Sequence, residues 1–189
     1  MDCLKIKIMS PIKKYLLLAL LATGTLYGQK YTTRTGTLKF EASVPSFEEV
    51  AAENKTASAA LDAANGDIAV LALMKGFRFK VALMEEHFNE SYAETDKYPK
   101  ATFKGKIEGF NLSGISSEGK SFTITGDLTM HGKTRKITDT ATISKTGNTV
   151  AITGNFTVKP EDFNIEVPKI VSKKVAGQVK ISYSLILAK

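Results

Sequence analysis

The chain has 189 residues, 43% of them hydrophobic, a size and composition that suit one globular domain with one hydrophobic core. It carries 26 lysine and arginine residues against 19 aspartate and glutamate residues, a formal net charge of +7. The basic residues are scattered along the chain, which is typical of a solvated surface and argues against a nucleic-acid partner. A single cysteine excludes a scaffold held by intrachain disulfides.

Residues 1–28 have the layout of a secretory signal peptide. Four lysines precede an uncharged apolar run, YLLLALLA at residues 15–22, and small residues follow at 23–25. The run is too short to cross a membrane as a helix, which takes roughly 20 residues. We expect cleavage after Gly28, and Met9 is an alternative start because Lys13 and Lys14 still precede the run. The competing interpretation is a short buried helix.

Removal of this leader changes the charge and the cysteine content of the domain that remains, residues 29–189. Four lysines and one aspartate leave with the leader, so the net charge falls to +4. Cys3 leaves as well, and because it precedes the apolar run it is not placed for lipid attachment. The sequence therefore predicts a periplasmic or secreted domain with no disulfide and no transmembrane anchor in its mature form.

Alternating strands begin soon after the leader. Residues 36–44 place Leu38, Phe40, Ala42 and Val44 on one face, as expected of a half-buried strand. Residues 48–54 are predicted to be a polar or helical connection, and 56–62 and 67–73 to be strands. Asn65-Gly66 between these two strands is a strong hairpin signal.

The segment from Gly76 to Gly105 organises the rest of the chain. Its first part, residues 77–83, alternates apolar and polar residues and predicts a strand. Met84, Phe88 and Tyr92 then recur at a spacing of four, which predicts about two turns of helix. Pro99 closes the helical part, and a new strand begins at Ala101.

Four further strands follow, at residues 122–130, 137–144, 150–158 and 179–187. Gly126 and Gly154 interrupt the apolar faces of two of them, which indicates a bulge or a tight bend. About eight alternating strands joined by short turns favour an antiparallel sheet. Closure into a barrel is favoured over a two-sheet sandwich because barrel strands must bend, although periodicity alone does not separate the two.

Three short motifs carry a resemblance to a known family. Residues 84–88 (MEEHF), 97–103 (KYPKATF) and 126–134 (GDLTMHGKT) are similar to the helical connection and the two main motifs of the YceI-like family of polyisoprenoid-binding proteins. Residues 161–165 (EDFNI) resemble a further family segment, from which Pro160 and Asn164 depart. The resemblance covers most of residues 32–188.

The resemblance implies an all-β fold, a single lipocalin-like barrel of eight antiparallel strands with one short helix and a long apolar tunnel. It also implies an isoprenoid or fatty-acid-like lipid as the partner. We expect neither a cofactor nor a metal. The alternative for each phenylalanine is a packed core. The candidate ligand-binding residues are Phe77, Phe79, Leu83, Met84, Phe88, Phe103, Phe122, Ile124, Leu128 and Phe156.

The residues themselves give little support for catalysis. His87 lies near Glu86 and Glu90, but a metal site needs further ligands in fixed geometry, and His131 belongs to a different motif. Serine-nucleophile signatures and phosphate-binding loops are absent from the sequence. We therefore expect a protein that is not an enzyme. The rival hypothesis, a hydrolase or isomerase acting on a lipid, would use His131 or Asp127.

The expected function is that of an exported carrier that holds an isoprenoid or other amphiphilic lipid chain. The alternative is a stress-related or interaction module whose barrel is filled by its own side chains. Four basic residues flank the organising segment and either meet an anionic head group or serve solubility: Lys75, Arg78, Lys97 and Lys100. Whether the protein forms a homodimer is left open.

Overall fold

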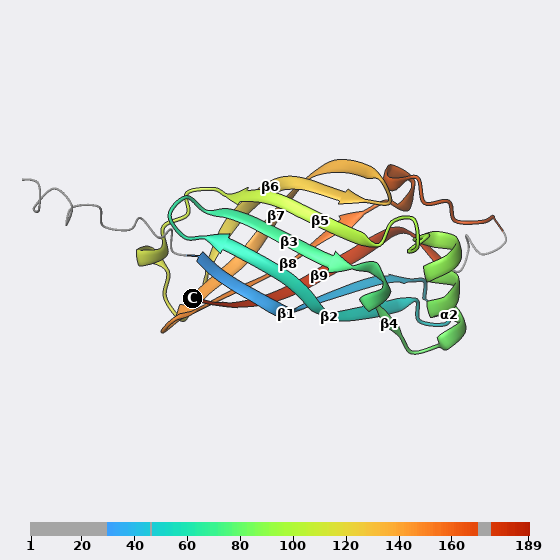
Figure 1. The fold of residues 1–189 in the computed structure, drawn as a ribbon, viewed down its shortest axis with the longest axis horizontal. Helices are drawn as coiled ribbons and strands as arrows, with labels where there is room; N and C mark the ends of the chain where they lie inside the picture. The colour runs from blue at the N-terminus through green and yellow to red at the C-terminus, as the bar shows by residue number, and fades with distance from the viewer. Residues whose placement is uncertain (1–29, 46, 170–174) are drawn as a thin grey trace, which may run out of the picture.

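Eight long antiparallel strands form a closed barrel (Figure 1). The computed structural model describes residues 30–45, 47–169 and 175–189, so the predicted leader lies outside the described residues. The long strands are β1 (Lys30–Ser43), β2 (Ala51–Asp62), β3 (Asp67–Leu73), β5 (Lys100–Ile107), β6 (Lys120–Met130), β7 (Lys133–Thr146), β8 (Thr149–Val158) and β9 (Val175–Ala188).

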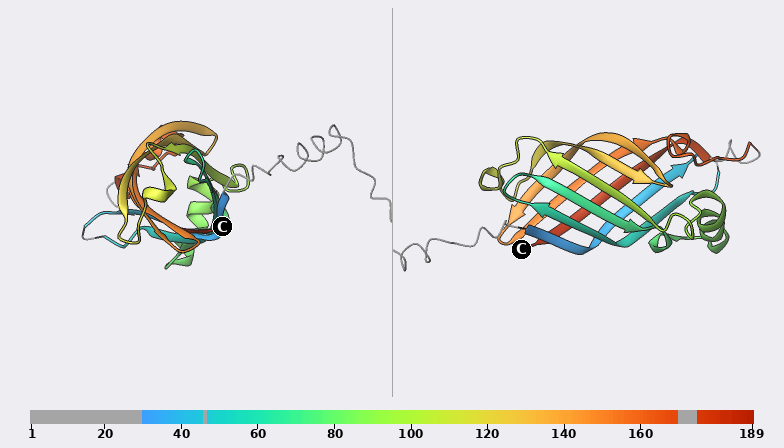
Figure 2. Two further views of the ribbon diagram at one scale, coloured as in Figure 1. Left: turned by 90° about the vertical axis from the view of Figure 1, so that its left-hand side faces the viewer. Right: turned by 45° about the horizontal axis from the view of Figure 1, so that its top comes forward.

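The strand order distinguishes a barrel from a sandwich. Neighbouring strands follow the order β1-β9-β8-β7-β6-β5-β3-β2, and β2 pairs back onto β1. A two-residue strand, β4 (Arg78–Phe79), adds to β2 with Ala52 opposite Phe79. The strands run obliquely around the axis, and the view along the barrel shows them as a ring (Figure 2). The predicted eight-stranded antiparallel barrel is confirmed.

Residues with positive φ, in the left-handed backbone conformation, form tight turns between adjacent strands. Gly66 has φ +78° in the predicted Asn-Gly hairpin, and the Asn65 side chain accepts the Asp67 N–H at 2.9 Å. His131 and Gly132, with φ of +50° and +72°, connect β6 to β7. Glycine is favoured at such positions because it has no Cβ to clash with the backbone.

The helical segment begins earlier than the sequence indicates. Helix α2 (Ala82–His87) continues into the π-helical turn η2 (Phe88–Tyr92), so the strand predicted over residues 77–83 is wrong beyond Phe79. Glu85 holds the helix against β4, because its carboxylate accepts the Phe79 N–H at 3.1 Å and the Arg78 guanidinium at 2.8 Å. This contact with residues six and seven positions earlier overrides the local alternation.

The prediction of a connection over residues 48–54 is also wrong for its last four residues, which belong to a strand. Ala51–Asn54 belong to β2 and pair with β1 from Glu41 to Leu38. Asn54 is fully buried, where its amide donates to the Leu73 carbonyl at 2.9 Å and its Oδ1 accepts the Thr56 N–H at 2.8 Å. A buried polar side chain and small alanines hide the apolar period by which a strand is identified.

Gly126 does not mark a bulge, because the register of β6 against β5 and β7 runs through it without a shift. It lies opposite Gly105, and a Cβ on Gly126 would lie 2.4 Å from the Gly105 Cα. The Phe103 ring would lie 2.7 Å from a Cβ at either glycine. The two glycines therefore make room for this ring on the inner wall of the barrel.

Two clusters of buried side chains divide the interior. The larger cluster fills the end of the barrel away from α2, and six of its members are Tyr31, Leu61, Ile107, Ile143, Ile152 and Leu187. The smaller cluster, Ala52, Ala72, Met74, Phe77 and Ala93, lies at the α2 end. We call the end filled by the larger cluster the closed end, and the end beside α2 the mouth.

Candidate functional site

An apolar cavity of about 410 Å³ lies inside the barrel, between the closed end and the mouth. Side chains from the long strands and from α2 and η2 line it. Several inward residues here are only half-buried, because they face empty space rather than one another: Phe103, Leu128, Ile137, Phe156 and Ile181. By contrast, Ile143, Ile152 and Leu187 at the closed end are fully buried.

The structure gathers eight of the ten residues predicted to bind a ligand around this cavity. They are Phe77, Phe79, Met84, Phe88, Phe103, Ile124, Leu128 and Phe156. They come from distant parts of the chain, and the closure of the barrel brings them together.

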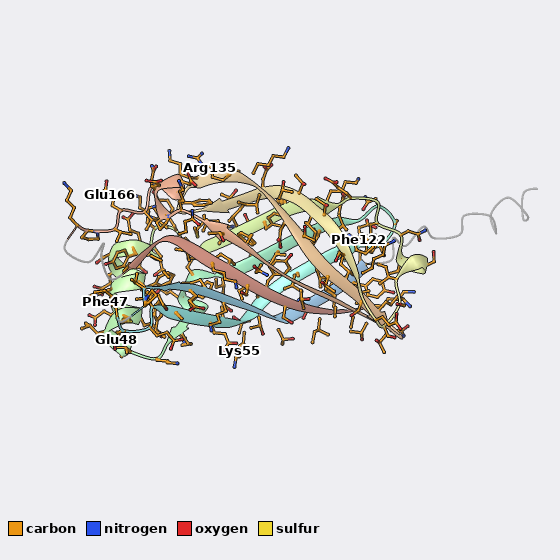
Figure 3. The ribbon with its side chains drawn as sticks, turned by 180° about the vertical axis from the view of Figure 1, so that it is seen from behind. Phe47, Glu48, Lys55, Phe122, Arg135 and Glu166 are labelled. Atoms are coloured by element: carbon orange, nitrogen blue, oxygen red, sulfur yellow. The ribbon has the colours of Figure 1, made fainter. Side chains whose placement is uncertain are left out.

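Leu83 and Phe122 do not line the cavity. Leu83 is 58% exposed, because the early start of α2 turns its side chain to the solvent. Phe122 faces inward but at the closed end, where its ring packs beside Phe110 at 6.2 Å between centroids, far from the mouth (Figure 3). Strand period indicates the face of a side chain but not its depth along the barrel axis.

Four phenylalanines form an aromatic cluster at the mouth. The Phe40 ring lies 5.6, 5.5 and 5.4 Å from the rings of Phe77, Phe79 and Phe88, measured between centroids. Phe88 also contacts Phe79 at 5.2 Å. Such pairs each add about 0.5–1.5 kcal/mol beyond the area they bury. The cluster therefore fixes β4 and η2 against β1 and gives the cavity a rigid apolar wall.

The two main sequence motifs meet at His131. Its ring lies 4.4 Å from the Tyr98 ring, and its Nε2 lies 2.8 Å from the Glu94 carboxylate. Nδ1 donates to the Phe163 carbonyl at 2.9 Å, since a carbonyl oxygen can only accept. His131 is thus hydrogen-bonded through both ring nitrogens, and it joins the β6–β7 turn to Glu94 and to Phe163.

The residues proposed for metal binding or hydrolysis are not assembled into a site. Asp127 is exposed on β6 between Lys104 and Lys136 of the neighbouring strands, outside the cavity lining. His87 is exposed at the edge of the cavity, and the described residues hold no group of three or more potential metal ligands. His131 does line the cavity, and its two ring nitrogens are taken up by Glu94 and by the Phe163 carbonyl.

The basic residues near the mouth are mostly engaged in ion pairs on the surface. Lys75 lies 2.6 Å from Asp96, and Arg78 lies 2.8 Å from Glu85. Lys97 lies 3.9 Å from Glu94 and 5.0 Å from the centre of the Tyr98 ring. Exposed pairs of this kind are weak, typically about 0–1 kcal/mol, so these cations stay available to an anion. Among the described residues, no helix is long and apolar enough to span a membrane.

A polar pair on the cavity wall was missed by the sequence analysis. The Tyr183 hydroxyl donates to Asp139 Oδ2 at 2.7 Å, and both residues line the cavity. Burial, followed by the hydrogen bond to Asp139 and its charge, raises the pKa of Tyr183 well above its ordinary value. The sequence does carry a signal for this pair, because Asp139 alternates with Ile137 and Ala141 on the inward face of β7.

Comparisons with solved structures find the same fold. A polyisoprenoid binding domain from Saccharophagus degradans, implicated in plant cell wall breakdown, matches with a TM-score of 0.73 and 13% identity over 85% of this chain and 98% of that one. BcnA from Burkholderia cenocepacia matches with a TM-score of 0.66 and 21% identity, covering 81% and 96% of the two chains. The Campylobacter jejuni YCEI protein matches with a TM-score of 0.58 and 18% identity, covering 72% and 82%.

A comparison with curated proteins found no match. The model of the YceI-like domain matches residues 25–187, which is most of the chain. The match includes the KYPKATF and GDLTMHGKT motifs and every long strand except the last residue of β9. This chain therefore belongs to the YceI-like domain family.

Proposed function

We propose that this protein is an exported, non-enzymatic carrier that encloses the apolar chain of an isoprenoid or a similar amphiphilic lipid. The observation that carries this proposal is the apolar cavity, whose aromatic wall and half-buried inward side chains leave a hydrophobic hollow inside a closed barrel. Sites for small apolar ligands are mostly preformed cavities of this kind. The solved Saccharophagus domain, which shares the fold, is described as polyisoprenoid binding.

Exclusion of water from the chain is the proposed source of affinity. Burial contributes about 0.8 kcal/mol for each methylene group that leaves water. An anionic head group would stay at the mouth, where Lys75, Arg78, Lys97 and Lys100 lie near the rim. Export through residues 1–28 belongs to the same proposal, and fractionation of the native host tests it by locating the processed chain.

Native mass spectrometry of the chain from Gln29 is the direct test of carriage. We expect a stoichiometric apolar molecule that is released on denaturation, and its extraction identifies the lipid class. An empty, folded protein that also ignores added isoprenoid lipids would contradict the proposal. It would instead favour an interaction module whose barrel holds no ligand.

A matched pair of substitutions on α2 ties the ligand to the cavity. Met84 lines the cavity, whereas its neighbour Leu83 is 58% exposed. Met84→Asp places a charge at the apolar wall and should abolish lipid retention, while Leu83→Asp should leave retention unchanged. Circular dichroism confirms that both variants are folded. Equal retention by the two variants would place the lipid outside this cavity.

A further inference from the structure

Strands β7 and β8 part on the mouth side of the barrel. Their pairing extends from Thr146 opposite Thr149 to Thr142 opposite Thr153 and ends there. Beyond this point β7 continues to pair with β6, and β8 continues to pair with β9. All of these residues lie in the described part of the chain. On the mouth side of this point the described residues show no pairing between β7 and β8, and a side-chain contact instead links β7 to β9.

Asp139 of β7 and Tyr183 of β9 make this contact across β8. Asp139 Oδ1 accepts the Thr140 N–H at 2.7 Å, and Oδ2 accepts the Tyr183 hydroxyl at 2.7 Å. The contact passes over Gly154 of β8, where a Cβ would lie only 2.3 Å from the Tyr183 oxygen. Glycine at position 154 is therefore required for the pair to form as it does.

Asp139 and Tyr183 can accept further hydrogen bonds but have no proton left to donate. The Tyr183 proton is committed to Asp139, so the lone pairs of the phenolic oxygen and of the carboxylate remain. Asp139 is the sole carboxylate among the described residues that line the cavity. Ile124, which lies opposite Asp139 on β6, and Ile137 and Phe156 on the same lining have no side-chain hydrogen-bond donor.

The pair lies at the inner end of the cavity rather than at the mouth. Asp139 precedes Ala141 and Ile143 on the inward face of β7, and both of these belong to the cluster that fills the closed end. Tyr183 packs against the same cluster. A ligand reaches these acceptors with the end of the chain that enters first.

We propose that Asp139 and Tyr183 form a binding site for an uncharged hydrogen-bond donor, such as a hydroxyl group, at the innermost end of the bound lipid. The site rests on the proposed carrier function and specifies its ligand class. A donor satisfies the free acceptors, an acceptor-only group leaves them without a partner, and an anion meets the charge of Asp139 in an apolar surrounding. The cavity therefore favours alcohols over esters and over carboxylates of the same chain.

Three ligands with one alkyl chain test the site: myristyl alcohol, methyl myristate and myristate. Calorimetric titration of the wild-type protein should give at least about tenfold tighter binding of the alcohol, the effect of one hydrogen bond to a charged group. In the double variant Asp139→Leu, Tyr183→Phe, the alcohol and the ester should bind equally.

Tyr31→Phe is the matched control, since Tyr31 is buried at the closed end and does not line the cavity. It should leave the preference for the alcohol unchanged. Equal binding of the alcohol and the ester by wild-type protein would overturn the inference and leave the carrier function standing. Failure of all three ligands to bind would instead count against the carrier function. The wild-type comparison remains decisive if the double variant does not fold.

Discussion

The length of the ligand chain is the variable that tests the cavity most directly. Each buried methylene contributes about 0.8 kcal/mol, and about 1.4 kcal/mol is a tenfold change in affinity. Each carbon that enters the cavity should therefore lower the Kd about fourfold. At ~30 Å³ for each small group, the volume of a water molecule in the liquid, a cavity of about 410 Å³ holds on the order of 14 non-hydrogen atoms.

The assay is calorimetric titration of primary alcohols of about 8 to 20 carbon atoms, a range that brackets the capacity of the cavity. We expect the fourfold gain per carbon to continue until the cavity is full and to flatten beyond it, because further methylenes emerge at the mouth. A Kd that does not depend on length among the short alcohols would refute the burial argument. An undiminished gain over the whole range would refute the volume argument.

One substitution should move the length at which the gain flattens. Ala101 lines the cavity, whereas Lys100 beside it is exposed. Ala101→Leu fills space with three additional carbon atoms, so the gain should flatten at a chain shorter by roughly three carbons. Lys100→Leu should leave the chain length at which the gain flattens unchanged. If the gain flattens at the same chain length in both variants, the alcohols do not occupy this part of the barrel.

Three further predictions concern the fold. Asn54→Leu removes the side-chain partners of the Leu73 carbonyl and the Thr56 N–H. The free energy of unfolding measured in urea should therefore fall by about 2–6 kcal/mol. A fall of less than about 1 kcal/mol would contradict this role of Asn54. In the same assay, Gly126→Ala should lower the free energy of unfolding by about 1–3 kcal/mol, because the new Cβ meets backbone atoms. Gly114→Ala, with open space around it, should not lower this free energy. Equal losses in the two variants would exclude the packing explanation. Burial and Asp139 raise the pKa of Tyr183 above the ordinary 10.0, so its contribution to stability is present below pH 10.0 and is lost as the pH rises further. Thermal melts should therefore fall more steeply above that pH for wild-type protein than for Tyr183→Phe, and parallel curves would contradict the prediction.

The sequence by itself determined the class of the fold and most of the strands. Alternation identified β3, β6 and β8 closely, because a strand with one dry and one wet face repeats every two residues. Asn65-Gly66 identified its hairpin because the turn requires positive φ. The motifs around Tyr98 and His131 identified the family, and the structure brings these two side chains into contact.

Only the tertiary structure decided which inward residues face a hollow. Phe103 and Phe122 both lie on inward strand faces, yet Phe103 lines the cavity and Phe122 closes the far end. Asp139 and Tyr183 meet across 44 positions of sequence and an intervening strand. Empty volume is what remains after many distant side chains have packed together, and no local pattern records that sum. Periodicity therefore predicts which way a side chain points, whereas closure of the barrel decides what it meets there.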